Sequence, residues 1–158
     1  RDGCEMMMDK LFNSTFENSL RILLLMDEFG KKQNLDMLYV ADFMVSYGAT
    51  FGFSKADLNG DNPYKFSEFA SRREIVRLAL KQLVLDGLVY PSDTDTGILY
   101  SLTELGHNLS LTLDSDYATE YRTTAKQVVI AVDGKSERVL IKEINKMSTA
   151  SLVKGSKA

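Results

Sequence analysis

Apolar residues recur at close to a helical period in the middle of the chain. Ser67 is a residue type that often caps a helix N-terminus, and Gly87 stands where a glycine in a left-handed conformation can end one. The pattern therefore predicts a helix from Ser67 to Asp86. Its apolar positions are Ile75, Leu78, Leu80, Leu83, Val84 and Leu85.

Two short β-prone runs, residues 88–90 and 98–100, follow this helix. The segment Pro91–Gly97 between them is rich in turn-forming residues, so the runs are expected to pair as a hairpin. Thr103 and Glu104 then open another helix. This order of elements is typical of a winged helix. We expect a mainly α fold with a small β-hairpin wing, built as a winged helix-turn-helix core with extra C-terminal helices.

Two apolar helices are predicted before this region. Asn13 or Ser14 can cap a helix over residues 15–29, with Glu17 as a capping-box partner of Ser14. Apolar residues cover almost its full circumference, so it is either the central helix of the domain or partly buried in a subunit interface. A second helix is expected over residues 35–47.

Two acidic residues on the second predicted helix are candidates for internal ion pairs. Asp36 lies in the first turn, where a negative charge suits the helix dipole. Asp42 lies among apolar residues, and a buried carboxylate is usually paired, with Arg72 or Arg73 as the obvious supply of positive charge. The alternative is that Asp42 sits at the edge of the apolar stripe and is solvated.

Further helices are predicted over residues 103–113, 117–132 and 136–147. The sequence thus divides into a flexible lead-in (1–12), a winged-helix domain (13–113), a C-terminal helical extension (114–147) and a flexible tail (148–158). The extension can pack on the core, dimerise or hold a partner.

Composition limits the chemistry to be expected. The chain has 158 residues, of which 44% are hydrophobic and 26% charged, which is typical of a folded protein. No apolar run reaches the roughly 20 residues that span a bilayer, and no signal-like start is seen, so we expect a cytoplasmic protein. Cys4 and His107 are the single cysteine and histidine, which argues against disulfide, zinc and Ser–His–Asp chemistry. We expect no catalytic residue, cofactor or metal.

Two motif-like segments do not change this expectation. Residues 57–68 have calcium-loop spacing, but Asn62 stands where the loop needs glycine. Gly134-Lys135-Ser136 resembles the end of a phosphate-binding loop, but Val129 replaces the first glycine.

The charge distribution argues against autonomous DNA binding. The formal net charge is −3, and residues 105–158 are the more basic part, with 8 Lys/Arg against 6 Asp/Glu. The helix 67–86 also carries three acids, and the predicted hairpin has no Lys or Arg. We expect the wing to contact protein through Asp93 and Asp95. Possible partner or DNA contacts on the helix are Arg72, Arg73, Arg77 and Lys81.

Five segments resemble, in their order and spacing, a known family. They are residues 12–23, 35–43, 71–76, 86–89 and 100–104. Together they resemble the middle component of three-component ABC-ATPase systems, bacterial anti-phage systems that include the Lamassu type. The resemblance extends from about Phe12 to Tyr121. Arg72 and Arg73 match the paired arginines of the family, and Asp36 and Asp42 match its acidic positions.

The resemblance implies a small, non-enzymatic winged-helix subunit. Its partners would be an SMC-like ABC ATPase that senses foreign DNA and a nuclease-type effector held inactive until triggering, with DNA contacted mainly through the complex. The alternative from another class is a MarR- or PadR-like dimeric transcription regulator. A basic recognition helix and a basic wing would favour the regulator, and only the first is partly present.

Overall fold

The computed structural model describes residues 13–58, 60 and 62–156, so the predictions for residues 1–12, Cys4 included, and for 157–158 lie outside it. The described residues form a mainly α, winged-helix-like arrangement with one two-stranded antiparallel hairpin, which confirms the predicted fold class. The elements are the π-helical turn η1 (Asn13–Glu17), α2 (Asn18–Phe29), α3 (Leu35–Ser46), α4 (Lys65–Leu85), β1 (Val89–Thr94), β2 (Gly97–Leu102), α5 (Glu104–Thr112), α6 (Asp116–Val132) and α7 (Glu137–Ser156).

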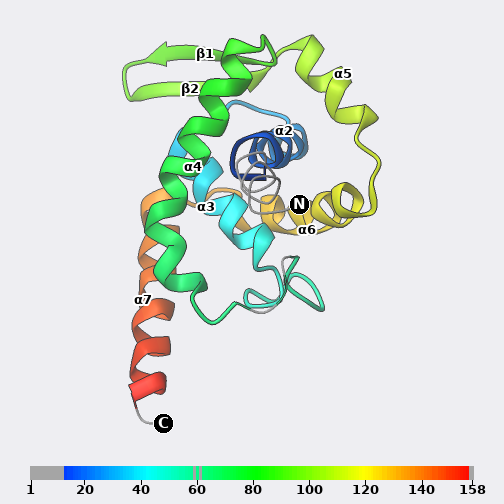
Figure 1. The fold of residues 1–158 in the computed structure, drawn as a ribbon. Coiled ribbons are helices and arrows are strands. Elements are labelled where there is room, and N and C mark those ends of the chain that lie inside the picture. Colours follow the sequence, from blue (N-terminus) through cyan, green and yellow to red (C-terminus); the bar gives the residue numbers. More distant parts are fainter. Residues whose placement is uncertain (1–12, 59, 61, 157–158) are drawn as a thin grey trace, which may run out of the picture.

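Helix α2 is the centre of the fold (Figure 1). It contacts α3, α4, α5 and α6, and its run Ile22–Met26 is almost fully buried. A helix that is apolar on nearly all sides must be covered on nearly all sides, and these four neighbours do so. The central position predicted for this helix is therefore the observed one.

Helix α6 belongs to the same core. It packs on α2 and α3, and its residues Tyr121, Ala125 and Val128 are fully buried. Helix α7 packs on α3 and α4 through Leu140 and Ile144. Both helices that follow the winged-helix region thus pack back on the core.

Different local structures set the two ends of helix α4. It starts at Lys65, two residues before the predicted cap, because the Asn62 side chain accepts a hydrogen bond from the Tyr64 N–H at 2.9 Å and sets the turn. Ser67 instead donates its hydroxyl to the Tyr64 carbonyl at 2.8 Å, so its predicted capping role is wrong. The other end is as predicted, because Gly87 has a φ of 75°.

The hairpin is longer than predicted. Most of Pro91–Gly97, expected to be a loop, is strand, and only residues 95–96 form the turn. Pro91 is tolerated because it lies opposite Tyr100, whose backbone N–H and C=O bond to Gln33 at 2.8 and 3.0 Å. The missing proline N–H therefore leaves no bond between the strands unmade.

The chain continues as helix beyond the predicted end of α7. The apolar pattern predicted an end at Met147 and a flexible tail, whereas residues 148–156 continue α7 to Ser156. The last turns of α7 extend past the other helices (Figure 1).

Candidate interaction surfaces

Asp42 on α3 is the charged centre of the core. Its side chain is fully buried and accepts hydrogen bonds from Arg21 of α2 at 3.2 and 3.3 Å. Arg72 of α4 donates to the same carboxylate at 2.9 Å, and the Tyr121 hydroxyl of α6 donates at 2.8 Å. One carboxylate therefore links four helices.

The surroundings of Asp42 keep it ionised. Burial alone would raise its pKa, but the positive charges of Arg21 and Arg72, with hydrogen bonds from Arg21 and Tyr121, lower the pKa to about 2. Burial, with the nearby Asp42 charge, raises the pKa of Tyr121 well above its usual value. Tyr121 is thus a hydrogen-bond donor and not a charged partner.

Arg72 is committed to the interior of the protein. It also donates to the Ser46 hydroxyl at 3.1 Å, and its guanidinium lies 5.9 and 5.8 Å from the ring centroids of Phe43 and Tyr47. Only 12% of the side chain is exposed. Little of Arg72 remains for contacts with a partner or with DNA.

The next two basic residues of α4 are paired at the surface. Arg73 donates to Asp36 of α3 at 2.7 Å, and Arg77 donates to Glu74 at 2.6 and 2.8 Å. Lys81 is exposed and forms no ion pair within the part of the chain that the structure describes. Of the four basic residues predicted to make contacts, Lys81 alone is left without an acidic partner there.

The hairpin extends from the C-terminal end of α4 (Figure 1). Leu78 and Leu85, included in the apolar pattern, are 42% and 70% exposed, since α4 is covered on one side only. Tyr90 and Ile98 on the strands are 53% and 45% exposed. We use the name α4–wing surface for the exposed residues on the outer side of α4 and on both faces of the hairpin, with Tyr90 on one face and Asp93 and Ile98 on the other. They are Leu78, Lys81, Leu85, Tyr90, Asp93, Asp95 and Ile98.

A second polar cluster, which sequence reasoning missed, joins α2, α5 and α6. Asp27 contacts His107 Nδ1 at 2.7 Å, the Ser110 hydroxyl at 3.0 Å and Arg122 at 3.1 Å. Burial would raise the pKa of Asp27, but hydrogen bonds from His107, Arg122 and Ser110 lower it. Ser110 donates to the carboxylate and not to the imidazole, so the three groups are not arranged as a Ser–His–Asp relay.

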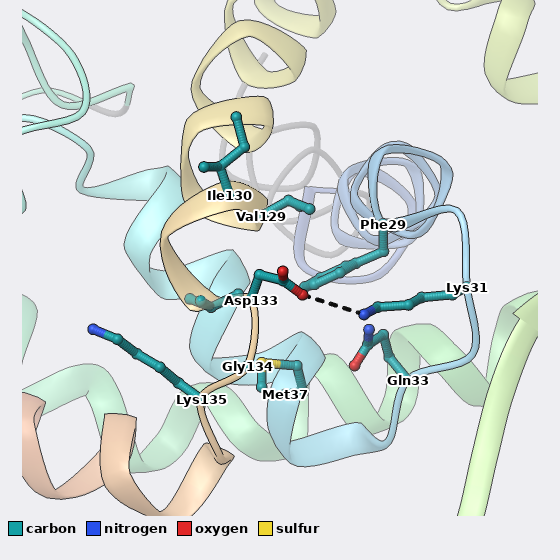
Figure 2. Close-up of a pocket in the computed structure, with 10 residues that line it drawn as sticks. Phe29, Lys31, Gln33, Met37, Val129, Ile130, Asp133, Gly134 and Lys135 are labelled. Atoms are coloured by element: carbon teal, nitrogen blue, oxygen red, sulfur yellow. Dashed lines mark hydrogen bonds and ion pairs between the residues drawn. The ribbon is translucent and has the colours of Figure 1, made fainter.

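A half-open pocket of about 420 Å³ lies where α6 turns into α7. Figure 2 shows Phe29 and Val129 on its apolar side and Lys31 paired with Asp133 across it, at 3.5 Å. Its lining is mixed, with apolar side chains beside Lys31, Gln33, Asp133 and Lys135. This pocket has no sequence signal, because its residues come from two segments that are distant in sequence, 29–37 and 129–135.

No group of three or more His, Cys, Asp or Glu side chains that could hold a metal ion occurs among residues 13–58, 60 and 62–156. None of the helices described is both long and apolar enough to cross a membrane.

The family model for ABC-three component (ABC-3C) system Middle Component 2 matches residues 11–154. The chain belongs to this family. No curated protein and no solved structure matched it. As a middle component, it is one part of a multicomponent ABC system and works together with the other components.

Proposed function

We propose that this chain is a non-enzymatic accessory subunit of an anti-phage defence complex. In this role it joins an SMC-like ABC ATPase to a nuclease-type effector, as in Lamassu-type systems, and helps to keep the effector inactive until DNA is sensed. Membership of the middle-component family supports a role inside such a complex.

The observation that carries the proposal is the character of the α4–wing surface. A winged helix that binds DNA places the equivalent helix in the major groove and touches phosphates with the wing. Here Arg73 and Arg77 are neutralised within the chain, and the wing presents Asp93 and Asp95. Exposed apolar and acidic groups favour a protein partner on this side.

The test is co-purification from cells that express the other components of the system. The combined variant Leu78→Asp, Leu85→Asp places two charges on the α4–wing surface at positions that the fold leaves exposed. We expect recovery of the partners to fall at least tenfold, because a carboxylate in an apolar contact is desolvated without a partner.

The matched control carries the same change on α5. Leu105 and Leu111 are 60% and 63% exposed, so Leu105→Asp, Leu111→Asp adds the same charge at similar exposure. This variant should co-purify as the wild type does. Equal losses in both variants would refute a specific role of the α4–wing surface. A stable homodimer that is recovered alone and shifts duplex DNA through α4 would favour the transcription regulator.

A further inference from the structure

The solvent-facing side of α7 carries a row of basic residues. Leu140 and Ile144 are the buried residues that hold this helix on α3 and α4. At 3.6 residues per turn, Arg138, Lys142 and Lys146 project from the opposite side, and all three are exposed. We call these three residues the α7 stripe.

The charges of the α7 stripe are not compensated by neighbouring acids. None of its three side chains forms an ion pair with any residue that the structure describes, whereas Arg73 and Arg77 of α4 each have one. Among the acids of α7, Glu137 accepts a hydrogen bond from Asn34 at 3.0 Å, and Glu143, three residues before Lys146, forms no ion pair with it in the described structure. Three positive charges therefore face solvent together.

We propose that the α7 stripe contacts the phosphate backbone of duplex DNA without recognising base sequence. Successive stripe residues are four apart, which is about 6 Å along a helix, so the row is about 12 Å long. This length is close to the rise of three to four base pairs. A regular row of cations matches a regular row of phosphates.

The composition of the stripe favours phosphate over a protein surface. Exposed Asn145 and Thr149 lie beside the row, Val139 at its edge is 48% exposed, and α7 has no aromatic residue. Protein interfaces are enriched in aromatic residues and depleted in lysine at their centres, whereas phosphate contacts are made by Lys, Arg and small polar side chains. An acidic protein partner is the outcome that the experiment must exclude.

This inference goes beyond the proposed function, because it assigns a DNA contact to the chain itself on a helix outside the α4–wing surface. The chain has a net charge of −3, so attraction must be local and sensitive to salt. The DNA measurement uses the full chain alone, so its failure is distinguishable from a failure to assemble with the other components.

The experiment is fluorescence anisotropy of two labelled duplexes of unrelated sequence at about 50 to 200 mM salt. Three phosphate contacts give a slope of about −3 for log K against log salt, and the affinity should fall roughly 40-fold over this range. The two duplexes should bind equally. The stripe variant, Arg138→Gln, Lys142→Gln, Lys146→Gln, should bind at least tenfold more weakly at the lowest salt and lose most of the salt dependence.

A control variant removes the same three charges from α4. It carries Arg73→Gln, Arg77→Gln and Lys81→Gln, so its net charge equals that of the stripe variant, and it should bind duplex DNA within about threefold of the wild type. Circular dichroism melts confirm that both variants fold. Equal losses in the two variants, no wild-type binding at the lowest salt, or unequal affinities for the two duplexes would overturn the inference. Loss of a protein component from the stripe variant, with no DNA binding by the wild type, would identify an acidic protein instead.

Discussion

Helices α4 and α7 both present arginine and lysine to solvent, but their charges meet different surroundings. On α4, Arg73 pairs with Asp36 of the neighbouring helix and Arg77 pairs with Glu74. On α7, the three stripe residues have no acidic partner among the described residues. The number of basic residues on a helix therefore does not tell which of them are free to bind an anion, because pairing depends on the neighbouring elements.

The two helices also differ in apolar content. The α4–wing surface exposes Leu78, Leu85, Tyr90 and Ile98, whereas the three stripe residues are charged and Val139 is the exposed large apolar side chain beside them. Apolar side chains gain free energy when a protein partner covers them, and isolated cations gain it from phosphates. This difference supports the two proposals, protein contacts for the α4–wing surface and DNA contacts for the α7 stripe.

The largest expected effect concerns the buried ion pair that Arg72 of α4 forms with Asp42. Asp42→Asn leaves Arg21 and Arg72 buried without a counter-charge, which should lower the free energy of unfolding by about 3–5 kcal/mol. Urea unfolding followed by circular dichroism measures this. The surface pair Arg73–Asp36 gives the matched control, because Asp36→Asn should lower the free energy of unfolding by at most about 1 kcal/mol. Similar losses in the two variants would contradict the distinction between the buried and surface pairs of α4.

The ionised Asp42 carboxylate also makes the free energy of unfolding depend on pH. The pKa of Asp42 is lowered from 3.8 to about 2 in the folded protein, so its contribution is fully present above pH 4 and is lost as the pH falls towards 2. The loss amounts to about 2 kcal/mol. It is measured as the difference in unfolding free energy between wild type and Asp42→Asn from pH 6 to pH 2, which cancels the contribution of Asp27. A difference that does not change with pH would refute this ion pairing.

The smallest expected effect is a change in the free energy of unfolding caused by a substitution on α7. Lys142 lies four residues from both Arg138 and Lys146, and like charges at this spacing repel one another. Lys142→Gln should therefore raise the free energy of unfolding by about 0.5 kcal/mol at low salt, and added salt should remove the gain. Arg77→Gln, which removes a paired charge from α4, should instead lower stability slightly. A loss of stability in Lys142→Gln would indicate a partner for this lysine within the chain.

Local signals in the sequence predicted most of the elements. Asn34 and Thr103 cap α3 and α5 with their side chains, and Gly87 ends α4, so residue types alone indicate the starts of α3 and α5 and the end of α4. The hairpin was predicted too short because Pro91 is typical of loops. Its place opposite Tyr100, which bonds to Gln33, depends on a contact distant in sequence.

The ion pairs and hydrogen bonds within the core could be predicted only in part from the sequence. The sequence left open whether Asp42 was solvated or paired with Arg72 or Arg73, and Arg72 is its observed partner. Arg21 was overlooked, although a single arginine inside an otherwise apolar helix is a signal for a buried acid. Tyr121 could not be foreseen, because its contact depends on how α6 crosses α3. The exposure of Leu78 and Leu85 likewise depends on which sides of α4 are covered.

The most direct test of the central claim is hydrogen–deuterium exchange of the chain, alone and within the complex purified with the other components. We predict slower exchange in β1, β2 and the last turns of α4 on assembly, with α7 unchanged until duplex DNA is added. Protection of α7 by the protein components, with none in the hairpin, would contradict the assignment of the α4–wing surface to protein contacts.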